Sequence, residues 1–458
     1  MPKAIWWIRR DLRLRDNATL HVALKHGDVI PVFVRDPHLG GAISARRQSF
    51  LWDALKSLNA DLRTKGSRLI FRSGTPESVL TQLLHETGAT TIFAEEDYTP
   101  YARKRDEKVA QSLPLKLVQG QLVHHPLAAL KADGTPYTVF TPFSKNWKAL
   151  LPTTLDILGA PERMPAVSAE IRSEDIPPGE QNPLFPASEA EAQRRLLDFC
   201  SPSPEGRGVG VRAYAETRDR VDLDGTSSLS PYLHFGMLGL REAVHHVRQA
   251  IVHGRDETSR KGAETWLNEL IWRAFYIHIL FHFPHVRDGS FRPEYDRIEW
   301  VNDPDEFAAW KAGRTGYPIV DAAMRQLRET GWMHNRARMI VASFLVKDLL
   351  IDWRWGERWF MENLLDGDLA ANNGGWQWTA GVGTDAAPYF RIFNPITQSQ
   401  KFDPNGDYIR RWVPELAHLA AKDIHAPVGV KGYSPMMVDH KFARERTLDA
   451  YKKAKSSS

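Results

Sequence analysis

Over residues 1–120, short runs of β-branched and aromatic side chains alternate with segments of helical periodicity. The runs predict strands at 3–8, 29–34, 68–72, 90–95 and 115–119, and the periodic segments predict helices at 17–25, 45–65, 76–87 and 101–113. Strands that alternate with helices at this spacing are joined by right-handed crossovers. The sequence therefore predicts an α/β domain over 1–125 with a parallel, doubly wound sheet.

The pattern changes after this domain. Ten prolines and few periodic apolar stretches lie between 126 and 190, which predicts a long interdomain linker. An all-α domain is expected over 191–458, with helices at 189–199, 231–252, 262–282, 318–330, 336–351 and 355–365. Only the tail at 452–458, KKAKSSS, looks disordered.

Composition narrows the class of protein. Cys200 is the single cysteine, so an internal disulfide is excluded, and Arg9, Arg10 and Asp11 interrupt the start of the chain before a signal sequence could form. No uncharged apolar stretch approaches the ~20 residues that cross a bilayer. We expect a cytoplasmic protein without a membrane partner, and the formal charge of +4 permits nucleic acid as a partner.

Several segments combine side chains that suit a ligand. Residues 366–378, DGDLAANNGGWQW, place carboxylates, amides and indoles together, which favours a polar, planar ligand such as a flavin; a glycine-rich turn is the alternative. TSSLSP at 226–231 either binds phosphate or caps a helix, with Ser230 as the expected N-cap. WLNELIWR at 266–273 indicates a pocket wall or a surface ion pair, and GWMHNRARM at 331–339 suits phosphate or base contact.

These motifs, with IRRDLRLRDNATL at the start, TGYPIVDAAMRQL at 315–327 and GTDAAPYFRIFNP at 383–395, resemble the DNA photolyases of the photolyase/cryptochrome family over nearly the whole chain. The likeness is strongest to bacterial cyclobutane pyrimidine dimer photolyases. It implies a monomeric, nucleoid-associated enzyme that needs no metal and acts on UV-damaged DNA. In such an enzyme reduced FAD, excited by blue or near-UV light, donates an electron to a dimer flipped out of the DNA and thereby splits it.

The resemblance places FAD in the helical domain. It assigns the FAD contacts to Tyr214, Thr226, Ser227, Ser228, Leu229, Ser230, Trp266, Glu269, Arg273, Arg338, Asp366, Asp368 and Asn372. Asn372 would face the flavin N5, where an amide favours the anionic reduced flavin because it offers no acidic proton. Trp376, Trp353 and Trp300 match the electron relay of the family, in that order from flavin to surface. With Glu269 and Asn372 they form the expected catalytic set.

The substrate contacts follow from the same resemblance. A dimer stacks poorly, so flipping it out of duplex DNA costs less than flipping normal bases. Trp272 and Trp378 would pack on the dimer, and Glu269, Asn335 and Met339 would meet its polar edges and the cavity floor. DNA contacts are expected from Arg218, Arg273, Arg336, Arg391 and Gln398. Asn335 stands where photolyases of six-four photoproducts use a histidine, which disfavours that substrate.

An antenna chromophore is expected in the α/β domain. YTPYARKRD at 98–106 and ARRQSFL at 45–51 resemble members that bind a deazaflavin or FMN rather than methenyltetrahydrofolate. Ligands of parallel sheets bind at the carboxyl ends of the strands. The site would be lined by Arg10, Asp11, Asp36, Arg47, Phe50 and Tyr101, with helix packing as the alternative interpretation for most of them.

Two other functions are compatible with the sequence. A cryptochrome-like blue-light photoreceptor would keep FAD and the relay but signal through a partner; retention of Trp272, Trp378, Glu269 and Asn372 weighs against it. A non-photochemical flavoprotein, or a nucleotide-binding protein related only through the first domain, is the weaker alternative.

Overall fold

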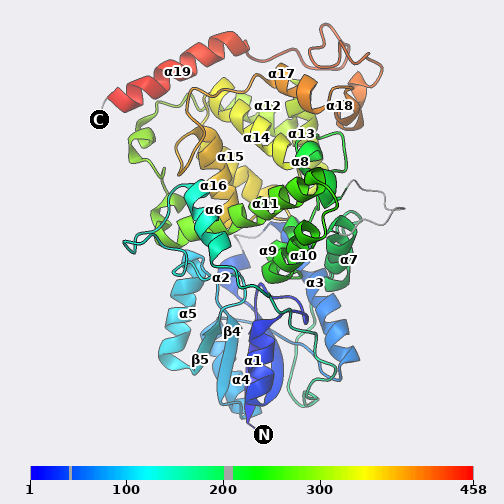
Figure 1. Ribbon diagram of the computed structural model, residues 1–458, viewed down its shortest axis with the longest axis vertical. Coiled ribbons are helices and arrows are strands. Elements are labelled where there is room, and N and C mark those ends of the chain that lie inside the picture. Colours follow the sequence, from blue (N-terminus) through cyan, green and yellow to red (C-terminus); the bar gives the residue numbers. More distant parts are fainter. Residues whose placement is uncertain (1, 41–43, 201–209, 457–458) are drawn as a thin grey trace. The chain divides into compact units, whose positions relative to one another are not determined.

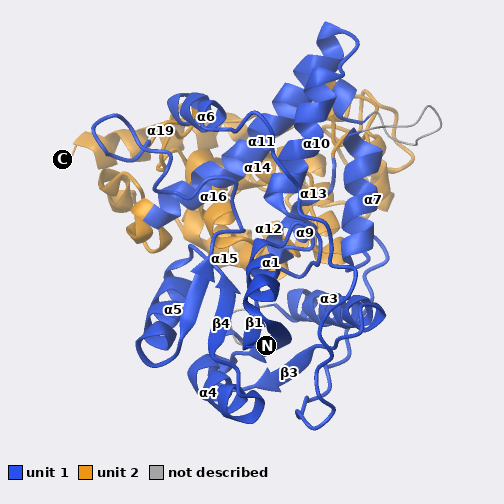
Figure 2. Ribbon diagram, turned by 60° about the horizontal axis from the view of Figure 1, so that its bottom comes forward, with its two compact units in different colours: residues 1–137, 141–215, 227–281 blue, residues 138–140, 216–226, 282–458 orange. Residues whose placement is uncertain are grey.

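The computed structural model describes residues 2–40, 44–200 and 210–456, and its contacts divide the chain into two compact units (Figure 2). Unit 1 comprises residues 1–137, 141–215 and 227–281, and unit 2 comprises residues 138–140, 216–226 and 282–458. These units cross the domain limits predicted at 125 and 190, because the helical segment 227–281 groups with the sheet.

Unit 1 contains a five-stranded parallel sheet with helices between successive strands (Figure 1). The strands are β1 (Lys3–Ile8), β2 (Asp28–Arg35), β3 (Ile70–Ser73), β4 (Thr91–Glu95) and β5 (Leu115–Val118). The intervening helices are α1 (Ala18–His26), α2 (Pro37–Gly40), α3 (Ala45–Thr64), α4 (Pro76–Thr87) and α5 (Pro100–Ser112). The strand order β3-β2-β1-β4-β5 reverses between β1 and β4, so the predicted doubly wound sheet is confirmed.

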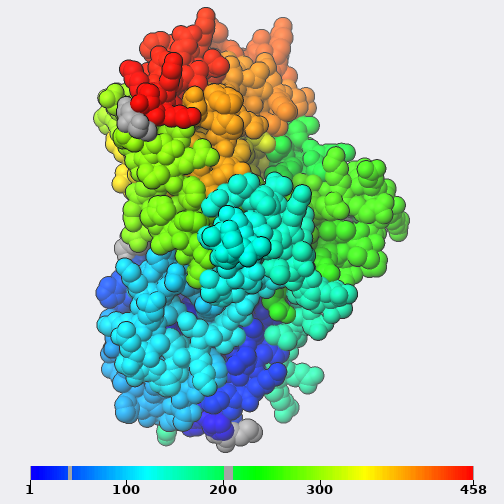
Figure 3. All heavy atoms as spheres, turned by 60° about the vertical axis from the view of Figure 1, so that its left-hand side comes forward, coloured from blue at the N-terminus to red at the C-terminus, as the bar shows by residue number. Residues whose placement is uncertain are grey.

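The chain after the sheet is more regular than predicted. Its helices are α6 (Phe140–Ala149), α7 (Glu189–Cys200), η1 (Val211–Ala213), α8 (Tyr214–Thr217), α9 (Ser230–Phe235), α10 (Leu240–Val252) and α11 (Glu257–His282). Helix α6 lies inside the segment predicted to be a linker, with Phe143, Ser144 and Trp147 on its buried face. Pro142 is tolerated because it lies in the first turn. Residues between β5 and α6, cyan in Figure 3, lie at the surface, where Leu127 is 55% exposed.

The helix predicted at 231–252 is wrong as a single element. Gly236 has a φ of 69°, in the left-handed region, and therefore ends α9 before α10 begins. A Cβ at this glycine would lie 1.7 Å from the Arg10 carbonyl oxygen. Only glycine permits this backbone approach within unit 1.

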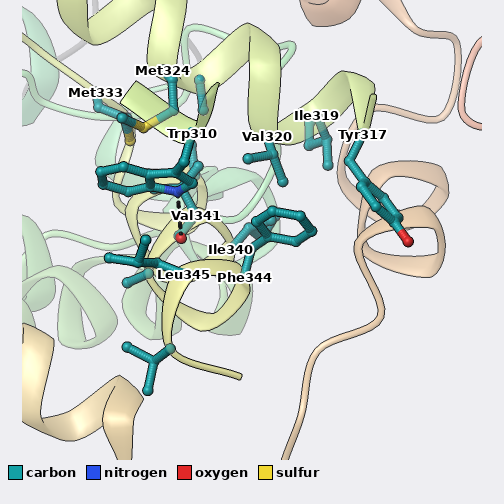
Figure 4. Packing of buried hydrophobic residues seen from close by; sticks show 14 of the residues in the cluster. Trp310, Tyr317, Ile319, Val320, Met324, Met333, Ile340, Val341, Phe344 and Leu345 are labelled. Atoms are coloured by element: carbon teal, nitrogen blue, oxygen red, sulfur yellow. Dashed lines mark hydrogen bonds between the residues drawn. The ribbon is translucent and has the colours of Figure 1, made fainter. Parts of the chain in front are cut away.

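Unit 2 is helical, as predicted for this part of the chain. It contains η2 (Pro284–Arg287), η3 (Pro293–Arg297), α12 (Pro304–Ala312), α13 (Pro318–Thr330), α14 (Asn335–Ser343), η4 (Phe344–Asp348), α15 (Trp353–Asn363), α16 (Leu369–Ala380), α17 (Pro395–Phe402), α18 (Asp407–Trp412), η5 (Pro414–Leu416) and α19 (His440–Ser456). Its apolar core includes Trp310, whose indole Nε1 donates to the Val341 carbonyl oxygen at 3.1 Å (Figure 4).

Two expectations for unit 2 need correction, and one alternative interpretation is excluded. The helix predicted at 336–351 ends at Ser343 and continues as a single π-helical turn, η4. The segment 366–378 is not a turn, because α16 runs through both of its glycines. The tail predicted to be disordered belongs to α19 up to Ser456, and residues 457–458 lie outside the described part. None of the helices in the described residues is both long and apolar enough to cross a bilayer.

Candidate functional site

A carboxylate cluster lies at the start of α16 in unit 2. Asp368 is the N-cap, and its side chain accepts from the backbone N–H groups of Ala370 and Ala371 at 3.1 and 3.2 Å. Asp366 accepts from the Arg338 guanidinium at 2.8 Å, and the Arg338 Nε donates to the Met333 carbonyl oxygen. The structure therefore brings together three of the predicted FAD contacts, two of them buried carboxylates.

Asn372 lies one turn further along α16 and is half-buried. Its Nδ2 donates to the Glu357 carbonyl oxygen of α15 at 3.0 Å, which fixes the orientation of the amide. The Asn372 Oδ1 accepts no hydrogen bond from the described residues. An oriented amide oxygen of this kind suits a ligand that offers an N–H group.

Amide side chains continue from Asn373 along the buried face of α16. The Asn373 Nδ2 lies 3.5 Å from the Glu357 Oε1, and its Oδ1 accepts from the Gln377 Nε2 at 3.0 Å. Gln377 also donates to the carbonyl oxygens of Val286 and Gly289, at 2.8 and 3.1 Å. The Gln377 Oε1 accepts from the backbone N–H of residue 291 at 2.8 Å. This network joins α15, α16 and the loop after α11, and every member of it belongs to unit 2.

Glu357 was missed by the sequence analysis. It lies on the buried face of α15 with Trp353, Gly356 and Phe360, and is 9% exposed. Burial raises the pKa of its carboxyl to about 7, because the hydrogen bond from Asn373 and more distant arginines offset only part of the cost of desolvation. The spacing of 353, 356, 357 and 360 was the available signal, since these positions share one helical face.

The three tryptophans of the predicted relay belong to one apolar core. Trp376 and Trp353 are 2% and 1% exposed, and Trp300 is partly buried against the same cluster. The Trp376 ring packs edge-on against Phe360 at 5.0 Å and against Trp310 at 6.2 Å between ring centroids. Burial thus decreases from Trp376 and Trp353 to Trp300, in the direction expected for a path toward solvent.

The predicted substrate contacts of unit 2 differ in exposure. Asn335 is exposed and lies one turn from Met339, with its Nδ2 4.0 Å from the methionine sulfur. The Arg336 guanidinium forms an ion pair with Asp219 at 2.8 Å, and Arg218 approaches the same carboxylate at 3.8 Å. The remaining members are the half-buried Trp378 and Gln398 and the exposed Arg391.

His334 has a structural role at the start of α14. Its Nδ1 accepts from the backbone N–H of Arg336 at 3.1 Å, so the side chain caps the helix. Burial lowers the pKa of His334 to about 4, with neighbouring arginines adding to the effect. The imidazole is therefore neutral near pH 7, and we assign it no proton-transfer step.

The helical part of unit 1 carries the other predicted FAD contacts. Tyr214 and Trp266 are buried against Phe199, at ring centroid distances of 5.7 and 5.0 Å. Trp266 is buried on α11, whereas Glu269, Trp272 and Arg273 lie half-buried on the same helix. Within 226–230, Leu229 is buried and Ser228 has a φ of 49°, in the left-handed region. Helix α9 begins at Ser230 with Leu229 at the N-cap, so the predicted cap is off by one position.

The carboxyl ends of β1, β2 and β4 carry a charged cluster in unit 1. Asp36 accepts from the Tyr101 hydroxyl and from the His38 backbone N–H. Arg9 and Arg105 both pair with the buried Asp106, at 2.6 and 2.8 Å. Burial, and then Asp36, raise the pKa of Tyr101 to about 12, so the phenol stays protonated.

The six residues predicted to line an antenna site separate into two groups. Asp11 is fully buried and accepts from the Trp6 indole and the Arg9 backbone N–H, both at 2.9 Å, and Phe50 is buried against Phe235. Both side chains are packed within unit 1, and their role in an antenna site stays a prediction. Arg10 and Asp36 follow the ends of β1 and β2, and Tyr101, whose hydroxyl donates to Asp36, is 36% exposed. Arg47 is buried on α3.

Comparison with known proteins shows similarity over the whole chain. Residues 4–166 match the model of the DNA photolyase family, and residues 266–453 match that of the FAD binding domain of DNA photolyase. A deoxyribodipyrimidine photo-lyase from Synechococcus is 40% identical over 99% of this chain and 97% of its own length.

Two solved structures share the fold. A bacterial class III photolyase from Agrobacterium tumefaciens superposes with a TM-score of 0.90 at 38% identity, covering 99% of this chain and 98% of its own. An archaeal photolyase from Sulfolobus tokodaii, whose structure holds two FAD molecules and implies a novel light-harvesting cofactor, has a TM-score of 0.84 at 34% identity. The alignment covers 98% of this chain and 100% of the archaeal one.

Proposed function

The chain belongs to the DNA photolyase family and is a light-driven DNA repair enzyme, and we propose that it splits cyclobutane pyrimidine dimers with reduced FAD held beside Asn372. The observation that carries this proposal is the orientation of the Asn372 amide. Its Nδ2 is bound by the Glu357 carbonyl oxygen, so its Oδ1 is the group left to accept a hydrogen bond. Reduced flavin offers an N–H at N5 that matches this acceptor.

The residues around Asn372 fit FAD in other respects. Arg338 is held by Asp366 and by the Met333 carbonyl oxygen, which places a cation beside the start of α16 for ribose and phosphate groups. By family resemblance, the remaining contacts are Tyr214, Thr226, Ser227, Ser228, Leu229, Ser230, Trp266, Glu269, Arg273 and Asp368. When bound, reduced FAD supplies on excitation the electron that opens the cyclobutane ring and receives it back afterwards.

For the substrate, we assign the protein side chains by resemblance and by exposure. Asn335 and Met339 present an amide and a thioether from one face of α14. Trp272 and Trp378 supply indole faces for the dimer, and Glu269 a carboxylate for its polar edge. Arg218 and Arg336 share Asp219, so this group keeps a net positive charge that suits DNA phosphate. We propose the same role for Arg273, Arg391 and Gln398, in a monomeric enzyme associated with the nucleoid.

A direct experiment separates repair from light sensing. The purified protein is reduced, mixed with an oligonucleotide that contains one thymine dimer, and exposed to blue light. Restored thymines are expected, with none in the dark. Photochemical reduction of the flavin without any repair would contradict the proposal and favour a cryptochrome-like receptor.

We further propose that unit 1 binds a second, antenna chromophore at the carboxyl ends of its strands. Arg10, Asp36 and Tyr101 supply polar groups there, and the order of the strands reverses between β1 and β4. Arg47 is assigned to the site by resemblance. A deazaflavin or FMN matches the sequence segments better than methenyltetrahydrofolate does. Mass spectrometry of pigments released by mild denaturation tests this assignment, and release of a folate in stoichiometric amount would overturn it.

A further inference from the structure

Gly356 provides a space on α15 into which the Trp376 ring fits. A Cβ built on this glycine would lie 2.1 Å from the Trp376 Cη2, 2.5 Å from its Cζ3 and 2.6 Å from the Leu345 Cδ2. Carbon atoms do not approach this closely without a bond, so a side chain here requires the ring or the helix to move. The contact lies within unit 2, between the buried faces of α15 and α16.

The Trp376 ring has little room to move. Phe360 packs against it at an interplanar angle of 79° and Trp310 at 70°, and Leu345 is fully buried. Trp310 is itself held by its hydrogen bond to the Val341 carbonyl oxygen. The Trp376 Nε1 has no hydrogen-bond partner among the described residues, so packing alone sets the position of this indole.

Gly356 also fixes where the ring lies relative to the next member of the relay. Trp353 precedes Gly356 by three positions on α15, and both belong to the buried face of that helix. Residues three apart are neighbours on a helix surface. The outer edge of the Trp376 indole therefore lies against the α15 backbone one turn from the base of the Trp353 side chain.

We propose that Gly356 is a positioning residue for electron transfer between Trp353 and Trp376, which rests on the proposed function of these tryptophans. In photoreduction, Trp376 loses one electron to the light-excited oxidised FAD. Trp353 then donates one electron to the oxidised Trp376, which becomes neutral again, while Trp353 is oxidised in its place. No atom is transferred. A side chain at 356 forces α15 and the Trp376 ring apart, lengthens the distance of this electron transfer and favours return of the electron from the flavin.

The first test is photoreduction and repair in the Gly356→Ala variant. We expect a several-fold loss in the yield of light-driven flavin reduction, with oxidised Trp376 outliving its wild-type lifetime in transient absorption. Repair by protein reduced chemically beforehand should stay near the wild-type rate, since that reaction does not use the relay. Equal photoreduction yields in variant and wild type would overturn the inference, and so would a parallel fall in photoreduction and repair.

The second test is independent of light and uses a double-mutant cycle on the full-length holoprotein. Gly356→Ala should lower the denaturant midpoint more in the wild-type background than in the Trp376→Phe background, because phenylalanine lacks the outer ring atoms that meet the added methyl, whereas the Leu345 Cδ2 meets it in both. If Gly356→Ala does not fold and the double variant does, the contact is supported. An equal loss in both backgrounds contradicts it.

Photoreduction of the wild-type protein separates a failure of the proposed relay from a failure of the role proposed for Gly356. Absence of photoreduction in the wild type would contradict the relay itself. Normal photoreduction in the wild type, unchanged by Gly356→Ala, would contradict only the role of Gly356.

Discussion

Replacing Glu357 by glutamine should stabilise the protein above pH 7 and leave its stability near pH 4.5 unchanged. The carboxyl is 9% exposed, and its one side-chain partner among the described residues is the amide of Asn373, 3.5 Å away. Burial raises the pKa of Glu357 to about 7 from an ordinary value of 4.5. Glutamine keeps the shape and the possible hydrogen bond but cannot ionise, so it removes the cost of a buried charge.

The sign and size of the expected change in the free energy of unfolding follow from proton linkage. Between pH 4.5 and about 7 the folded state holds the Glu357 proton more tightly than the unfolded state does, so stability falls as the pH rises. The full free-energy cost of burying the charged Glu357 carboxylate is present above pH 7 and absent below pH 4.5. At ~1.4 kcal/mol per pKa unit, the difference between the two pKa values corresponds to roughly 3 kcal/mol.

The assay is guanidinium unfolding followed by tryptophan fluorescence at several pH values between 5 and 8. Wild type, Glu357→Gln and Glu362→Gln are compared, the last being an exposed glutamate of the same helix. We expect the difference between Glu357→Gln and wild type to grow with pH, and Glu362→Gln to follow wild type. A Glu357→Gln protein that is less stable than wild type at pH 8, or one with the same pH dependence, would refute the reasoning.

Three further substitutions test the site. Trp376→Phe should abolish light-driven reduction of oxidised flavin, because phenyl is harder to oxidise than indole, and should spare repair by enzyme already reduced; normal photoreduction would contradict the relay. Gln377→Ala removes four hydrogen bonds and, at about 1 kcal/mol each, should lower the free energy of unfolding by roughly 4 kcal/mol. A loss below ~1 kcal/mol would mean that the network contributes little. Arg338→Met removes the guanidinium that pairs with the buried Asp366 carboxylate and should cost about 3 kcal/mol in denaturant unfolding. Addition of Asp366→Asn should restore part of this loss, and absence of recovery would argue against the ion pair.

Much of the fold could be predicted because local patterns decide it. Each predicted strand is present within two residues at either end, since β-branched runs between helices specify a buried parallel sheet. Helix α6 was missed because prolines on both sides suggested a linker, although Phe143 and Trp147 have helical spacing. The break at Gly236 depends on the approach of the Arg10 backbone, which no local pattern reveals.

The site was predicted less completely, because its chemistry depends on contacts between helices. Family resemblance predicted Asp366, Asp368 and Asn372 as FAD contacts, but the orientation of the Asn372 amide comes from a backbone carbonyl on another helix. The raised pKa of Glu357 has the same origin, since burial of that carboxyl requires α15 to pack on α16. Asp11 resembled a ligand contact in the sequence, and only the structure shows its hydrogen bonds to Trp6 and to the chain around it.

The most direct test of the central claim is the wavelength dependence of dimer splitting. The initial rate is measured with chemically reduced protein and a dimer-containing oligonucleotide, at equal photon flux across the near-UV and blue. If reduced FAD is the electron donor, the rate per photon should follow the absorption of the bound reduced flavin and of any antenna pigment, and should vanish in the dark. Splitting in the dark, or no splitting while reduced flavin and DNA are both bound, would contradict the account.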